Sequence, residues 1–77
     1  MLRYTNANNV AELATNKNAV AYNTEDQAVY TSFNFHSKTK DSAGDIVYFT
    51  AKRKAYNGRL ELVLVAIQND NVIAWQT

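Results

Sequence analysis

Lysine, arginine and tyrosine are interleaved along one short segment, and together these residue types bind anionic partners. Lys52, Lys54, Tyr56 and Arg59 all fall within residues 52–59. Alternate residues of an extended strand share a face, so the first three point the same way. Tyrosine rings can stack on nucleic-acid bases while basic groups neutralise phosphates, and the same side chains can meet an acidic protein surface. The segment therefore predicts a binding site.

The side chains that could do acid–base or nucleophilic chemistry are few. His36 is the only histidine of the chain. A catalytic histidine needs an acid or a nucleophile within hydrogen-bond reach. Ser32, Ser37 and Asp41 lie near His36 in the sequence, but this does not bring them together in space. We therefore expect a surface histidine.

No other catalytic, cofactor or metal-binding pattern is present. Glu25 and Asp26 are adjacent acids in a polar turn, where carboxylates are normally solvated. The two glycines, Gly44 and Gly58, cannot make a phosphate-binding loop. The absence of cysteine excludes disulfides and, with a single histidine, the common zinc sites. We predict a protein that is not an enzyme and has no catalytic residue, cofactor or metal.

The basic segment belongs to a predicted hairpin of residues 45–56 and 59–67. Asn57-Gly58 joins the two alternating runs and favours a type I′ turn, which needs φ > 0 at both positions. A two-residue turn fixes the register and places Tyr56 opposite Arg59. The faces of both strands then follow from alternation.

This register gives the second strand two apolar faces. Leu60, Leu62 and Leu64 make the face expected to form the core, together with Arg53, whose charged end is expected in water. The opposite face has a basic half near the turn, where Lys54 faces Glu61, and an apolar half. The apolar half, predicted to be an interface, consists of Tyr48, Val63, Val65 and Ile67.

A short helix and further strands are predicted around the hairpin. Asn9 can cap a helix of about ten residues, with Glu12 at capping-box spacing. The strand at 28–36 alternates, with Val29, Phe33 and Phe35 on one face and Tyr30 on the other. Residues 37–44 are expected to be the longest loop. Further strands are expected at 19–23 and 72–76, with a short one at 2–5. The predicted class is α+β: one N-terminal helix packed on a four- to five-stranded antiparallel meander.

The predicted helix is too short to cover both faces of this sheet. A ten-residue helix is about 15 Å long. The second apolar surface is then exposed or covered by another molecule, which predicts a contact surface. The alternative is a strongly twisted, barrel-like sheet that encloses both faces in its own core.

Length and composition limit the class of protein. The 77 residues indicate one domain, residues 1–77, and the net charge of +1 argues against a dedicated duplex-DNA binder. No run of 18 apolar residues and no secretory signal is found, so we expect no membrane segment and a cytoplasmic location. Because neither disulfides nor metals can stabilise so small a core, we expect a homodimer or a stable partner.

These observations predict a small interaction protein. Ten asparagines and no proline are typical of an AT-rich coding sequence, which suggests a phage or a mobile element. We expect an inhibitor or regulator that binds a host protein through its sheet surface and basic hairpin end. The alternative is a small nucleic-acid-binding domain that uses Lys52, Lys54, Tyr56 and Arg59.

Overall fold

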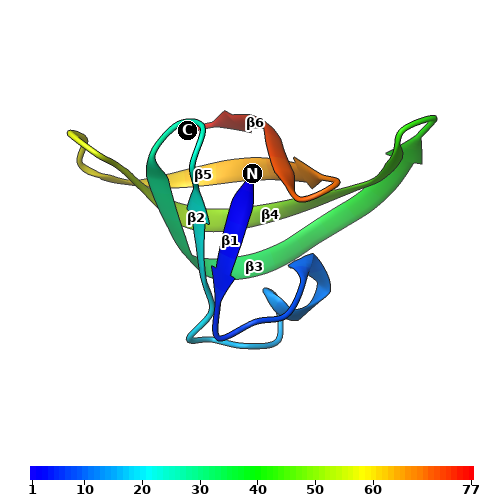
Figure 1. The fold of residues 1–77 in the computed structure, drawn as a ribbon, viewed down its shortest axis with the longest axis horizontal. Coiled ribbons are helices and arrows are strands. Elements are labelled where there is room, and N and C mark those ends of the chain that lie inside the picture. Colours follow the sequence, from blue (N-terminus) through cyan, green and yellow to red (C-terminus); the bar gives the residue numbers. More distant parts are fainter.

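Six antiparallel strands follow one another in a single curled sheet, a half-barrel, in the computed structural model of residues 1–77 (Figure 1). The only helical element is the 3₁₀ turn η1, Val10–Glu12. The predicted α+β class is therefore wrong. The strands are β1 (Leu2–Thr5), β2 (Val20–Asn23), β3 (Ala28–Asp41), β4 (Gly44–Ala55), β5 (Leu60–Gln68) and β6 (Asn71–Gln76).

The predicted helix begins but does not propagate. The Asn9 side chain caps the turn by accepting a hydrogen bond from Glu12 N at 3.2 Å. The following side chains then bond to nearby backbone groups: Thr15 Oγ1 donates to Glu12 O, and Asn18 N donates to Asn16 Oδ1. Such local bonds compete with helical ones, and a single turn gains too little to continue by itself.

The core lies on the concave face of the half-barrel. The ring of Phe49 contacts Phe33 and Phe35 edge-on, with centroids 5.4 and 6.3 Å apart. Leu13, which follows η1, is 1% exposed and anchors the 6–19 segment to this core. The buried cluster is Leu2, Leu13, Ala19, Ala21, Ala28, Tyr30, Phe33, Phe49, Ala51, Val63, Val65 and Ile67.

A bulge in β3 breaks the predicted alternation. Ser32 has φ of 56°, and the pairing of β3 with β4 shifts just after Thr31. Before the bulge Tyr30 points inward and Val29 outward, whereas after it Phe33 points inward. The extra residue thus buries both aromatic rings, which strict alternation would have placed on opposite faces.

The segment predicted to be the longest loop is also strand. β3 continues to Asp41, which pairs with Gly44 across a two-residue turn. Asp41 Oδ1 accepts a hydrogen bond from Ala43 N at 2.8 Å within this turn. The β3–β4 arm therefore projects from one end of the molecule, and the β4–β5 turn projects from the other (Figure 1).

The register of the β4–β5 hairpin is one residue away from the prediction. Lys54 pairs with Leu60 and Arg53 with Glu61. Neither residue of Asn57-Gly58 has φ > 0, and Gly58 N donates to Ala55 O at 3.0 Å, so the turn is not type I′. A one-residue shift moves every side chain of a strand to the other face.

The type I′ turn that was predicted for the β4–β5 hairpin occurs instead in the β5–β6 hairpin. Gln68 pairs with Asn71 across Asn69 and Asp70, whose φ angles are 50° and 61°. Two positive φ angles in a two-residue loop are the signature of type I′. A register shift farther along leaves Ile73 as a bulge in β6.

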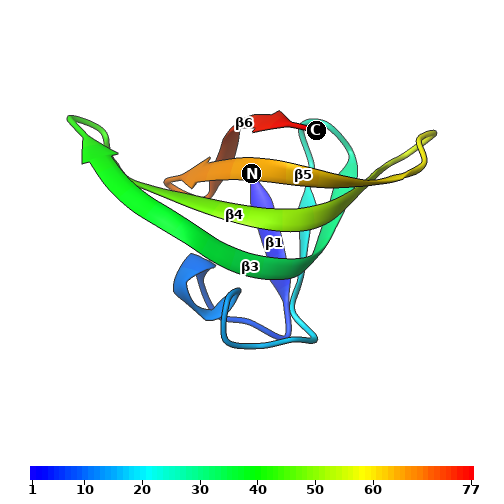
Figure 2. The same cartoon turned by 180° about the vertical axis from the view of Figure 1, so that it is seen from behind.

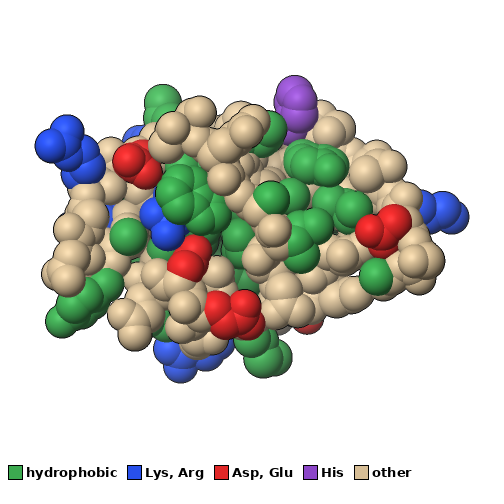
Figure 3. All heavy atoms as spheres, turned by 90° about the horizontal axis from the view of Figure 1, so that it is seen from above, with side chains coloured by type: hydrophobic (Ala, Val, Ile, Leu, Met, Phe, Trp, Pro, Cys, Tyr) green, Lys and Arg blue, Asp and Glu red, His purple; other side chains and the backbone are tan.

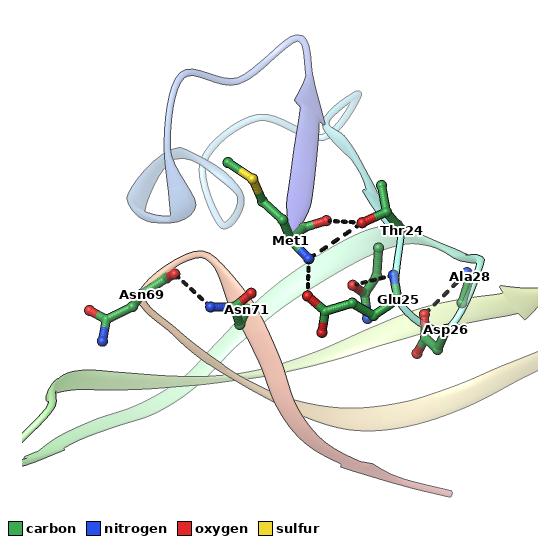
Figure 4. Close-up of polar contacts among 8 residues, drawn as sticks. Met1, Thr24, Glu25, Asp26, Ala28, Asn69 and Asn71 are labelled. Carbon is green, nitrogen blue, oxygen red and sulfur yellow. Dashed lines mark hydrogen bonds and ion pairs between the residues drawn. The ribbon is translucent and has the colours of Figure 1, made fainter.

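Two hydrogen bonds join edge strand β1 to the turn before the other edge strand, β6. Leu2 N donates to Asp70 O at 2.9 Å, and the Tyr4 hydroxyl donates to Asp70 Oδ1 at 2.6 Å. The amine of Met1 is paired with the Glu25 carboxylate in the β2–β3 turn (Figure 4). Beyond these contacts β1 and β6 separate, which leaves the barrel open.

Candidate functional site

The exposed end of the β4–β5 hairpin carries both basic and apolar side chains on its outer surface. On this surface Lys54 lies directly opposite Leu60, and Lys52 lies directly opposite Leu62. The outer faces of β3, β4 and β5 are toward the viewer in Figure 2. We call the set Lys52, Lys54, Tyr56, Leu60 and Leu62, together with Arg59 at the exposed turn, the basic–leucine surface. The observed register places Arg59 in alternation with Glu61 rather than with the leucines.

These leucines are exposed to an unusual degree. Leu62 is 74% exposed and Leu60 is 57% exposed. Burying a leucine side chain is worth roughly 1.5–3 kcal/mol, so two exposed neighbours represent surface that a contact could remove from water. Tyr56, at the turn, is 78% exposed and adds an aromatic ring.

The charges on this surface have one sign. Lys52, Lys54 and Arg59 are exposed, and none of them forms an ion pair. The actual register places Glu61 opposite Arg53 rather than opposite Lys54, so no acid lies opposite either lysine. The two lysines therefore stand opposite leucines rather than opposite an acid.

The residues predicted to form the apolar interface fall into two groups. Val63, Val65 and Ile67 are 4%, 0% and 2% exposed, so these three lie in the core of the chain itself. Tyr48 remains on the outer surface, where it lines a shallow hollow of about 210 Å³ with Leu64. The exposed apolar side chains of β5 are thus the leucines that were predicted to be the core.

Arg53, expected to reach into water, is buried on the concave face. Its Nε donates to the Tyr30 hydroxyl at 3.1 Å, and its Nη2 donates to Asp26 Oδ2 at 3.3 Å. The Tyr30 hydroxyl donates in turn to Asp26 Oδ2 at 3.1 Å. The guanidinium carbon lies 3.8 Å from the centroid of the Trp75 ring. Every buried polar side-chain atom has a partner, which is typical of a structural cluster.

This cluster changes the proton affinity of its members. Burial raises the pKa of the Tyr30 phenol to about 12, with Asp26 adding to the rise and Arg53 opposing it. Burial disfavours the charge of Arg53, but the hydrogen bonds to Tyr30 and Asp26 outweigh this effect and raise the pKa of Arg53. At neutral pH the phenol is neutral and the guanidinium is charged.

The concave face also holds a hollow of about 510 Å³ beneath the η1 turn. Its floor includes Phe35 and Val47, and this volume is in the range of small-molecule sites. The charged groups at its mouth are already partnered, since Lys38 lies 3.9 Å from Asp45. The Oδ1 atom of Asp70, another lining residue, accepts a hydrogen bond from the Tyr4 hydroxyl, and most of the other lining residues are apolar.

The remaining candidates for chemistry form no hydrogen-bonded group. His36 is exposed on β3, and no hydrogen bond links it to Ser32, Ser37 or Asp41. No group of three or more His, Cys, Asp or Glu side chains is arranged to hold a metal ion. The one helical turn of this chain is far shorter than a membrane-crossing helix, and no other helix is present.

Comparisons of this chain with protein-family models, with curated proteins and with solved structures give no match.

Proposed function

We propose that this protein is a small, non-enzymatic interaction module that binds an acidic surface of a partner protein through its basic–leucine surface. Occupation of that surface would inhibit or regulate the partner. The proposal keeps the cytoplasmic location expected because the sequence shows no secretory signal.

The observation that carries the proposal is the pairing of exposed leucines with unpaired lysines. Leu62 lies directly opposite Lys52, and no other part of the chain covers either of them. Apolar burial would supply affinity, while the basic groups would speed association with an acidic partner and select against a basic one.

A second candidate is nucleic-acid binding by the same hairpin end. Exposed Tyr56 beside Lys54 and Arg59 supports this alternative, because an aromatic ring among basic groups can stack on a base while they contact phosphates. The leucines distinguish the two functions. A protein contact would use Leu60 and Leu62, whereas phosphate and base contacts would not need them.

Four proteins separate these candidates in one experiment. Immobilised wild type, Leu62→Ser, the triple variant Lys52→Ala/Lys54→Ala/Arg59→Ala, and the charge control Lys38→Ala/Lys40→Ala are each exposed to cell lysate and to mixed-sequence DNA and RNA. The control removes basic side chains from the β3–β4 arm, away from the proposed surface.

For protein binding we expect one protein that is captured by the wild type and the control and is lost with Leu62→Ser and with the triple variant. For nucleic-acid binding we expect retention at low salt that falls steeply as salt rises, is lost in the triple variant and is unchanged in Leu62→Ser. Capture that is identical for the wild type and Leu62→Ser would contradict the proposed function.

A further inference from the structure

Strand β6 is an edge of the sheet whose backbone groups have partners on one side only. β5 takes that side. On the other side, β1 reaches only the turn before β6, through the bond from Leu2 N to Asp70 O. No backbone–backbone hydrogen bond links residues 72–77 to any segment except β5. Free N–H and C=O groups in a row bind an added strand.

The side chains of β6 do little to prevent such pairing. Natural edges are protected by lysines, prolines, inward charges or bulges. Residues 71–77 contain no proline and no charged side chain, and the bulge at Ile73 is the one protective device. Ile73 and Trp75 are 48% and 40% exposed. The opposite edge, β1, is shorter and carries Arg3.

Space for a strand exists beside β6. A hollow of about 420 Å³ lies between residues 72–75 and the opposite wall, which consists of Asn23 at the end of β2 and Glu25 and Asp26 in the β2–β3 turn. In the view from above, hydrophobic side chains gather along the middle of this face, with acidic side chains next to them (Figure 3). Glu25 and Asp26 are paired with the Met1 amine and with Arg53, so this wall gives no strong preference for a charged strand.

We propose that β6 pairs in an antiparallel manner with β6 of a second copy of this chain, about a two-fold axis at Ala74. This register places Ile73 opposite Trp75 of the second copy, and Val72 opposite Gln76. Pairs of β-branched and aromatic side chains stabilise antiparallel strands. Because β6 is neutral, self-pairing brings no like charges together, and a charged foreign strand would find no complementary group on β6.

A dimer would also suit the small core of this chain. The concave cluster comprises 12 buried residues, and no disulfide supports it. Domains of this size are commonly stabilised by association. The contact uses a different strand from the basic–leucine surface and does not rest on the proposed function, so either can fail while the other stands.

Sedimentation equilibrium of the whole chain tests the proposal. A single edge pairing belongs among small, weak interfaces of less than about 1,200 Å². The protein is therefore measured from about 10 μM to about 1 mM, the range in which a weak Kd is visible. We expect the wild type to move from monomer toward dimer across this range.

Two variants locate the contact. Ile73→Lys places a charge on the edge and is expected to weaken dimerisation at least tenfold. Leu62→Lys adds the same charge to the basic–leucine surface and is expected to dimerise like the wild type. A wild type that stays monomeric at about 1 mM, or an Ile73→Lys variant that dimerises normally, would overturn the proposal, as would loss of the dimer in Leu62→Lys alone.

Amide hydrogen exchange of the wild type gives a result that does not depend on the folding of a variant. We expect amides of residues 72–76 that do not bond to β5 to gain protection as concentration rises, while those of Arg3 and Tyr4 in β1 do not change. Exchange in 72–76 that is independent of concentration, in a sample that dimerises, would place the contact elsewhere and refute the β6 pairing.

Discussion

The two faces of β5 are similarly apolar but have opposite environments. Val63 and Val65 lie inside the half-barrel with almost no exposure, whereas Leu62, the residue before Val63, is 74% exposed on the outer surface. The inner face is enclosed by the curl of the sheet and by the 6–19 segment. The outer face has no such cover and stands beside lysines of β4. Apolar character alone therefore does not identify a core, because the curvature of the sheet decides which face is enclosed.

The largest expected difference comes from placing the same charge on each face. Val65→Asp puts an uncompensated carboxylate in the core and is expected to lower the free energy of unfolding by about 3–5 kcal/mol, enough to unfold a small domain. Leu62→Asp is expected to change it by less than about 0.5 kcal/mol. Urea denaturation of both variants makes the measurement. Equal losses of unfolding free energy in the two variants would contradict the burial of one face of β5 and the exposure of the other.

A smaller difference in the free energy of unfolding is expected between removing a charged partner of a buried side chain and removing one of an exposed side chain. Asp26→Asn leaves buried Arg53 without its ionic partner and should cost about 1.5–3 kcal/mol. Asp45→Asn removes an acid whose partner, Lys38, lies 3.9 Å away, with both side chains about 60% exposed. This exposed pair should be worth about 0–1 kcal/mol. Denaturant midpoints that fall equally would contradict a structural role for Asp26 as the partner of buried Arg53.

The inner face should also respond to alkaline pH. An unfolded tyrosine loses its proton near pH 10, whereas the pKa of folded Tyr30 is about 12. Between these values Tyr30 keeps its proton in the folded chain and loses it in the unfolded chain, so its contribution to stability should be complete below about pH 10 and fall as pH approaches 12. Tyr30→Phe should flatten part of this fall. The free energy of unfolding at several pH values makes the measurement, and an unchanged slope in Tyr30→Phe would contradict the buried environment.

The smallest stability effect is expected on the outer face. The double variant Leu60→Ser/Leu62→Ser should remain within about 0.5 kcal/mol of the wild type. It should nevertheless lose partner capture, because the leucines supply the apolar part of the proposed contact. A thermal melt paired with the capture experiment checks both results, and a strongly destabilised variant would mean that these leucines pack within the chain.

The sequence predicts the elements of this fold more readily than their registers. The meander, the hairpin at 45–67 and the Asn9 cap were predicted because they depend on local patterns. The helix failed because Thr15 and Asn16 form local bonds that the apolar spacing does not reveal. The bulge at Ser32 could not be predicted, because the residue with positive φ is a serine and not a glycine.

The two hairpin turns explain why the residues predicted to form one apolar interface lie partly in the core and partly on the outer surface. Asn57-Gly58 is a strong type I′ signal, yet the type I′ geometry occurs at Asn69 and Asp70. Turn preference is a local term, and it is outweighed in this hairpin by burial of the valine face and by the pairing of Arg53 with Asp26, a residue 27 positions away. The basic residues near the turn were found because they are exposed on this hairpin end in the actual register. The leucines were missed because the predicted register assigned them to the core.

Thiol labelling at two neighbouring positions tests the assignment of the β5 faces most directly. The chain has no cysteine, so Leu62→Cys and Val63→Cys each introduce a single thiol. We expect the thiol at position 62 to react at nearly the rate of a free thiol, and the thiol at position 63 to react only when the chain unfolds. Fast labelling at position 63 with protection at position 62 would restore the register set by an Asn57-Gly58 type I′ turn and would contradict the burial of the valine face.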